Sequence, residues 1–118
     1  MPTNVAKLVD QLVETYLNHG FPKRFFRDAS HINSGSCQDF AEELCDIINA
    51  QADLKTEGYA TAVWDSDMCD MDGLHCFVSF NDKFYDSECP NGVDHPADLP
   101  IYSRIEEYYH SELRQCSI

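Results

Sequence analysis

The stretch Leu74–Asp86, LHCFVSFNDKFYD, contains two short apolar and aromatic runs separated by Asn81-Asp82. Asn and Asp tolerate the left-handed backbone that a tight hairpin turn requires, so this dipeptide favours a turn. Each flanking run is typical of a β-strand. The sequence therefore predicts an antiparallel hairpin with strands at Leu74–Phe80 and Lys83–Asp86.

The length of this turn decides which side chains share a face of the sheet. With two turn residues, Phe80 lies opposite Lys83, and His75 and Asp86 become diagonal neighbours on one face. A third turn residue would place Asp86 opposite Val78 and direct it away from His75. The hairpin therefore predicts a His–Asp pair that depends on its register.

Upstream of the hairpin, the small residues Ser34-Gly35-Ser36 lead into an amphipathic pattern that predicts a helix over Cys37–Gln51. A cysteine at the first turn of a helix lies beside unpaired backbone N–H groups and the positive end of the helix dipole, which favour a thiolate. Cys, His and Asp in this chain order are typical of a thiol acyl-transfer enzyme. Cys37 would be the nucleophile, His75 the base and then the acid, and Asp86 the residue that orients the imidazole.

Acyl transfer also needs N–H donors for the oxyanion that forms on the substrate carbonyl. The backbone N–H of Cys37 is the expected first donor, because it lies at the start of the predicted helix. A second donor is expected from a side chain, and three residues close to Cys37 in sequence are candidates. They are His31, Asn33 and Gln38.

The rest of the chain completes an α+β domain. Apolar residues recur at helical spacing in Asn4–Asn18, and Tyr59–Trp64 has the composition of a strand. A closing helix is predicted over Ser103–Gln115, whereas Glu88–Pro100 is rich in Pro, Gly, Asn and Asp and is predicted to be irregular. A length of 118 residues fits a single domain, 1–118, with N-terminal helices, a small antiparallel sheet and a C-terminal helix.

The charge of the chain restricts its partners. A formal net charge of -13 would repel phosphates, so direct nucleic-acid binding is not expected, and a protein or peptide substrate with basic groups fits better. Met1–Leu17 lacks the apolar core of a signal peptide, and no stretch is long enough to span a membrane. The expected location is the cytoplasm, where the six cysteines would be free thiols. The oligomeric state stays open.

Two groups of residues could in principle bind a metal. An acidic loop contains Asp65, Asp67, Asp70 and Asp72. Its spacing does not fit the calcium-binding EF-hand, and a solvated loop is the simpler interpretation. A zinc site could be built from Cys69, Cys76, Cys89 and His95. No C-x-x-C pair supports such a site, and the predicted acyl transfer needs no cofactor.

Three segments, in this order, resemble the signature segments of papain-like cysteine enzymes. They are Ser34–Ala41 (SGSCQDFA), Gly73–Val78 (GLHCFV) and Lys83–Asp86 (KFYD). The resemblance is closest to the transglutaminase-like branch and is also similar to the core of arylamine N-acetyltransferases. It implies a papain-like fold and acyl transfer through a thioester on an amide carbonyl. The implied activities are those of a cysteine peptidase, a deamidase or a transglutaminase-like enzyme, with hydrolysis preferred because water is the default acceptor.

The composition also supports a function without catalysis. A small chain with this charge could be an acidic binding or inhibitor protein that covers a basic surface, as nucleic-acid mimics of viral or mobile-element origin do. A mimic requires carboxylates in a long stripe, whereas an enzyme requires a cleft at Cys37.

Overall fold

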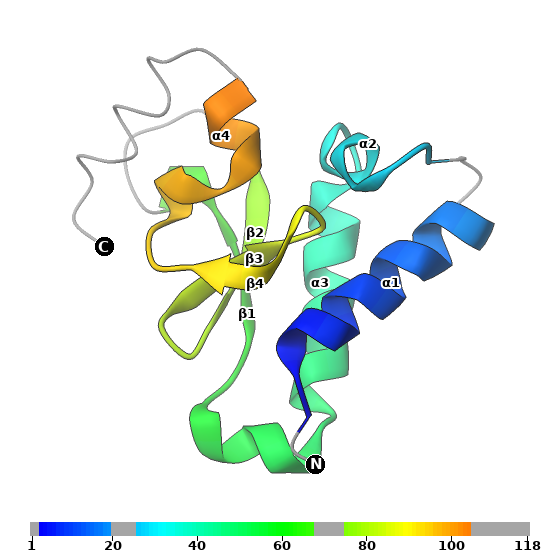
Figure 1. Cartoon of the computed structure of the whole chain (residues 1–118). Helices are drawn as coiled ribbons and strands as arrows, with labels where there is room; N and C mark the ends of the chain where they lie inside the picture. Colours follow the sequence, from blue (N-terminus) through cyan, green and yellow to red (C-terminus); the bar gives the residue numbers. More distant parts are fainter. Residues whose placement is uncertain (1–2, 20–25, 68–74, 105–118) are drawn as a thin grey trace.

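A four-stranded antiparallel sheet lies at the centre of the protein (Figure 1). The computed structural model describes residues 3–19, 26–67 and 75–104. The strands are neighbours in chain order, which confirms the α+β class. They are β1 (Thr61–Trp64), β2 (Cys76–Phe80), β3 (Lys83–Asp86) and β4 (Cys89–Val93).

Helices cover both faces of this sheet. They are α1 (Val5–His19), α2 (Ala29–Asn33), α3 (Cys37–Asn49) and α4 (Pro100–Arg104), with short 3₁₀ turns η1 (Ala52–Glu57), η2 (Asp65–Asp67) and η3 (Pro96–Asp98). Side chains alternate along each strand, so Cys76 and Val78 pack into the core formed with α1 and α3. Phe77 and Phe84 point the other way and pack with η3 and α4. The two faces of one thin sheet therefore contribute to two separate cores.

The hairpin between β2 and β3 has the predicted register. Asn81 and Asp82 have φ angles of 52° and 62°, the left-handed values expected for a two-residue hairpin turn. Phe80 pairs with Lys83, and two positions further on Val78 pairs with Tyr85. This pairing places Asp86, the last residue of β3, on the same face as Phe77 and His75.

The segment Glu88–Pro100 is not irregular throughout, which corrects the prediction. Cys89–Val93 forms β4, which pairs with β3 across a bulge. Pro90 and Gly92 argue against a central strand, but β4 is at the edge of the sheet, where a missing N–H can face away from the ladder. The interpretation from composition therefore failed because it took no account of the strand's position in the sheet.

The structure describes the predicted N-terminal helix in full but only the first residues of the predicted C-terminal helix. The N-terminal helix agrees to within about one residue. The last described helix, α4, begins at Pro100, three residues before the predicted closing helix, and the segment 105–115 of that prediction lies outside the described residues. Among the described residues, no helix has the length and apolarity required to cross a bilayer.

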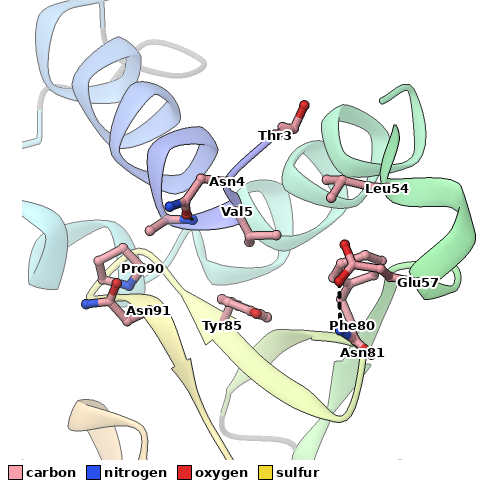
Figure 2. Close-up of a pocket in the computed structure, with 11 residues that line it drawn as sticks. Thr3, Asn4, Val5, Leu54, Glu57, Phe80, Asn81, Tyr85, Pro90 and Asn91 are labelled. Atoms are coloured by element: carbon pink, nitrogen blue, oxygen red, sulfur yellow. Dashed lines mark hydrogen bonds between the residues drawn. The ribbon is translucent and has the colours of Figure 1, made fainter. Parts of the chain in front are cut away.

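A cavity of about 320 Å³ lies beyond the C-terminal end of α3, between the start of α1, η1 and the β2–β3 hairpin (Figure 2). This is the end of α3 opposite to Cys37. Tyr85 lines the cavity, and its ring packs directly against Gly92 of β4. A Cβ atom at Gly92 would lie 2.8 Å from Cε1 of Tyr85, so the tight contact between β3 and β4 requires glycine.

We expect Gly92→Ala to lower the free energy of unfolding by about 1–3 kcal/mol, because the added methyl group overpacks against the Tyr85 ring. Urea denaturation would measure the loss. Gly58→Ala is the matched control, since Gly58 also has a positive φ but a Cβ atom added there would meet no other atom within 4 Å. An equal loss in both variants would assign the effect to backbone strain and not to the contact with Tyr85.

Candidate active site

His75 and Asp86 meet at the end of the sheet where β2 begins and β3 ends. Nε2 of His75 lies 3.0 Å from Oδ2 of Asp86, and the side chains are 0% and 2% exposed. The other carboxylate oxygen, Oδ1, accepts the backbone N–H of Glu88 at 2.9 Å. Both oxygens of Asp86 therefore accept hydrogen bonds, and a proton on Nε2 leaves Nδ1 of His75 as the reactive nitrogen.

The thiol of Cys37 also interacts with this imidazole. Cys37 is the first residue of α3 and is 9% exposed. Burial raises the pKa of the thiol, but hydrogen bonding from His75 and from the backbone N–H groups of Cys76 and Gln38 outweighs it. The pKa of Cys37 is therefore lower than that of an ordinary cysteine, as expected for a thiol at a helix start.

The pKa of the His75 imidazole is shifted upward, opposite to that of the thiol. Burial lowers the pKa of His75, but the hydrogen bond to Asp86 and the interaction with Cys37 more than offset it and raise the pKa to about 9. Nδ1 is buried and has no hydrogen bond of ordinary geometry among the described residues. Catalytic contacts are often long before substrate binds, so the missing bond does not argue against an interaction between Nδ1 and the thiol.

The pKa values of the other described cysteines are raised and not lowered. Burial raises the pKa of Cys45 and of Cys76 to about 12, and that of Cys89 to about 11. Cys89 is as buried as Cys37, each being 9% exposed, so burial alone does not explain the difference. Among the described cysteines, the lowered pKa is specific to the position beside His75.

Two of the predicted oxyanion donors have other partners. Nδ1 of His31 accepts the backbone N–H of Arg27 at 3.1 Å. The Gln38 side chain is exposed, and its amide nitrogen donates to Glu42 at 3.2 Å. These bonds hold both side chains on other partners, whereas the backbone N–H of Gln38 interacts with the thiol.

Asn33, the third candidate, belongs to a polar cluster beside Asp86. Its amide nitrogen donates to Oε2 of Glu88 at 3.4 Å, and Arg104 donates to the same oxygen at 2.6 Å. The amide oxygen of Asn33 is buried and lacks a hydrogen-bond partner among the described residues. Through its bond to Glu88, Asn33 supports the turn that holds Asp86.

Sequence reasoning missed Asp65 and Tyr102. The acidic loop was predicted to be solvated, but Asp65 is fully buried and accepts hydrogen bonds from the backbone N–H of His75 and from the Tyr102 hydroxyl. The prediction is wrong for Asp65 alone: Asp67 is exposed, and Asp70 and Asp72 lie outside the described residues. Asp65 lies opposite His75 because Trp64 pairs with Cys76, and this pairing of two separate strands is not visible in composition.

The metal hypotheses gain no support from the part of the chain that can be described. Within it, no three side chains of His, Cys, Asp or Glu lie close enough together to hold an ion. Cys69, Asp70 and Asp72 lie outside the described residues. The described donors therefore suit proton transfer and nucleophilic attack better than metal binding.

The arrangement combines a thiol of lowered pKa, a buried imidazole and a carboxylate that fixes the outer nitrogen of that imidazole. These groups can generate a thiolate, hold the proton it releases and deliver that proton to a leaving group. No protein-family model, curated protein or solved structure matches this chain. The chemistry of this site is therefore the basis on which its function can be argued.

Proposed function

We propose that the protein is a thiol acyl-transfer enzyme that acts on an amide carbonyl, with hydrolysis as the preferred outcome. The observation that carries this proposal is the buried His75, bonded at Nε2 to Asp86 and interacting on its other side with Cys37. A buried histidine with a raised pKa beside a thiol with a lowered one is a typical sign of a functional site.

In the first half of the reaction, the Cys37 thiolate attacks the carbonyl carbon and a carbon–sulfur bond forms. The electron pair of the carbonyl moves to oxygen, where the backbone N–H of Cys37, left unpaired at the helix start, stabilises the oxyanion. The carbon–nitrogen bond then breaks. His75 gives its proton to the leaving amine, and a thioester on Cys37 remains.

In the second half, water attacks the thioester while His75 accepts the water proton. The carbon–sulfur bond breaks, the carboxylic acid leaves, and Cys37 returns to the thiolate. The net reaction converts an amide and water to an acid and an amine. An amine in place of water would give transamidation, so the acceptor and not the triad decides the subtype.

The arrangement of elements supports a papain-like, transglutaminase-like core as part of this proposal. The thiol opens α3, and the histidine and aspartate lie at the adjoining ends of the antiparallel strands β2 and β3. A formal net charge of -13 favours a protein or peptide substrate with basic groups. The free thiols of Cys37, Cys45, Cys76 and Cys89 fit the cytoplasm, where cysteines are kept reduced.

Site-resolved alkylation tests the proposal. Near pH 7, we expect iodoacetamide to modify Cys37 at least about tenfold faster than Cys89, because the pKa of Cys37 is lowered and that of Cys89 is raised to about 11. The more basic thiolate of Cys89 is the stronger nucleophile, but this offsets only about half of the difference in thiolate population. Peptide mass spectrometry after a short exposure would measure both rates in one sample. Cys89 is an internal control of equal exposure. Equal, slow labelling of both cysteines would contradict catalysis and favour an acidic binding protein.

A further inference from the structure

Asp65 continues the β1–β2 ladder through its side chain. It lies opposite His75, and its backbone N–H donates to the His75 carbonyl at 3.1 Å. The return bond from the His75 N–H goes to the Asp65 carboxylate at 3.2 Å and not to a backbone carbonyl. His75 precedes the first residue of β2, so this carboxylate fixes the backbone of the histidine where the regular ladder has ended.

Tyr102 of α4 connects the same carboxylate to the imidazole ring. Its hydroxyl donates to Oδ2 of Asp65 at 2.9 Å, the atom that also accepts the His75 N–H. Its ring stands edge-on to the His75 ring, with 5.9 Å between the centroids and 75° between the planes. Burial, followed by the charge of Asp65, raises the pKa of Tyr102 well above its ordinary value, so the hydroxyl remains a donor.

A fully buried carboxylate is costly, because an ion loses its hydration when it leaves water. Apolar residues would fill the same space without that cost. The two bonds to one oxygen of Asp65 join three elements at one histidine: η2, the start of β2, and α4. Among the described residues, the ionisable groups that interact with His75 are Cys37, Asp86, Asp65 and Tyr102.

We propose that Asp65 and Tyr102 are positioning residues that hold the His75 imidazole between Cys37 and Asp86. The inference rests on the proposed function. Asp65 holds the backbone of His75, and the Tyr102 ring limits the tilt of the imidazole. Proton transfer depends on geometry held to within about half an ångström, and supporting side chains maintain such geometry.

The test compares Tyr102→Phe with Tyr16→Phe. Both remove the hydroxyl of a buried tyrosine that donates to a carboxylate, since Tyr16 bonds Glu43 at 3.1 Å between α1 and α3. Near pH 7, we expect Tyr102→Phe to slow alkylation of Cys37 about fivefold, the effect of one lost hydrogen bond, and Tyr16→Phe to leave the rate unchanged. Above about pH 9, where an ordinary thiol ionises without help, the rates should converge.

Substitutions of Asp65 provide the second arm. Asp65→Leu removes the acceptor and should slow alkylation of Cys37 at least as much as Tyr102→Phe does. Asp65→Asn retains an oxygen for the same two donors and should keep most of the wild-type alkylation rate. Labelling of Cys76, which is 1% exposed, reports any general opening of the site. The titration of the His75 imidazole by NMR, in Tyr102→Phe and Tyr16→Phe, gives a measurement that is independent of the thiol.

The outcomes separate the two proposals. Fast labelling of wild-type Cys37, together with Tyr102→Phe and Asp65→Leu variants that match Tyr16→Phe in labelling and in His75 titration, would overturn the positioning role and leave the proposed function standing. A wild-type Cys37 that labels no faster than Cys89 would remove the proposed function. In that case, a His75 titration that moves in Tyr102→Phe alone would still support control of the imidazole by Tyr102.

Discussion

Asp86→Asn is expected to lower amide turnover about a hundredfold or more, the usual contribution of general acid–base catalysis. The two oxygens of Asp86 accept two donors, Nε2–H of His75 and the N–H of Glu88. Asparagine has one oxygen and can accept only one of them. If that oxygen stays on Glu88, the new amide donates to Nε2 and forces the imidazole proton onto Nδ1, where it can no longer take the proton of Cys37.

The measurement pairs two assays. A pool of unstructured peptides containing glutamine and lysine would be incubated with each variant, and mass spectrometry would distinguish cleavage, deamidation and cross-linking by their mass changes. Alkylation of Cys37 should slow toward the rate of Cys89 at the same time. Asp94→Asn is the matched control, because it removes the same charge from an exposed carboxylate bonded to Lys83. Equal losses in the two variants would indicate a general charge effect and contradict a specific role for Asp86.

The hairpin shows why part of this site was predictable from sequence. Asn81-Asp82 restricts the turn to a small set of backbone shapes, and the two-residue period of a strand then determines which side chains share a face. Local chemistry therefore placed Asp86 within reach of His75 without knowledge of the rest of the fold. The helix that begins at Cys37 was predictable for a similar reason, because its apolar period is strong.

The supporting residues were not predictable in the same way. The role of Asp65 depends on the pairing of β1 with β2, two strands separated in sequence, and on a hydroxyl from α4 far downstream. Strand β4 depends on its position at the sheet edge, where Pro90 is tolerated. Both features are fixed by tertiary pairing, whereas composition and local period describe only neighbours in sequence.

Cys37→Ala is expected to abolish thioester formation and therefore all peptide turnover, because alanine cannot attack a carbonyl. The free energy of unfolding near neutral pH should change by less than about 1 kcal/mol, since the thiol lies at the edge of the core. Cys45→Ala is the matched control: Cys45 is a buried cysteine of the same helix whose pKa is raised to about 12. It should retain full turnover, and turnover that survives in Cys37→Ala would exclude Cys37 as the nucleophile.

The same variant should change how stability depends on pH. The pKa of His75 is raised from 6.5 to about 9, so its contribution is complete below pH 6.5 and is lost as pH rises through the folded value. The pKa of Cys37 is lowered from 9.0, so its contribution is present above pH 9.0 and is lost as pH falls through the folded value. In the wild type the two contributions to stability change in opposite directions between pH 6.5 and 9.0. They do so because the thiol proton is held by the imidazole in the folded protein.

Removing the thiol also removes two of the interactions that raise the pKa of His75, so in Cys37→Ala only the hydrogen bond and charge of Asp86 oppose burial. To the extent that Asp86 keeps this pKa above 6.5, Cys37→Ala should lose stability relative to the wild type in urea denaturation from pH 6.5 upward. The pKa values of Cys45 and Cys89 do not depend on Cys37, so the contributions of these thiols cancel in the difference, whereas the pKa of Cys76 is raised in part by the charge of Cys37. Parallel curves would mean either that Cys37 ionises like an ordinary cysteine or that Cys37 itself raises the pKa of His75, and NMR titration of His75 in Cys37→Ala would distinguish the two.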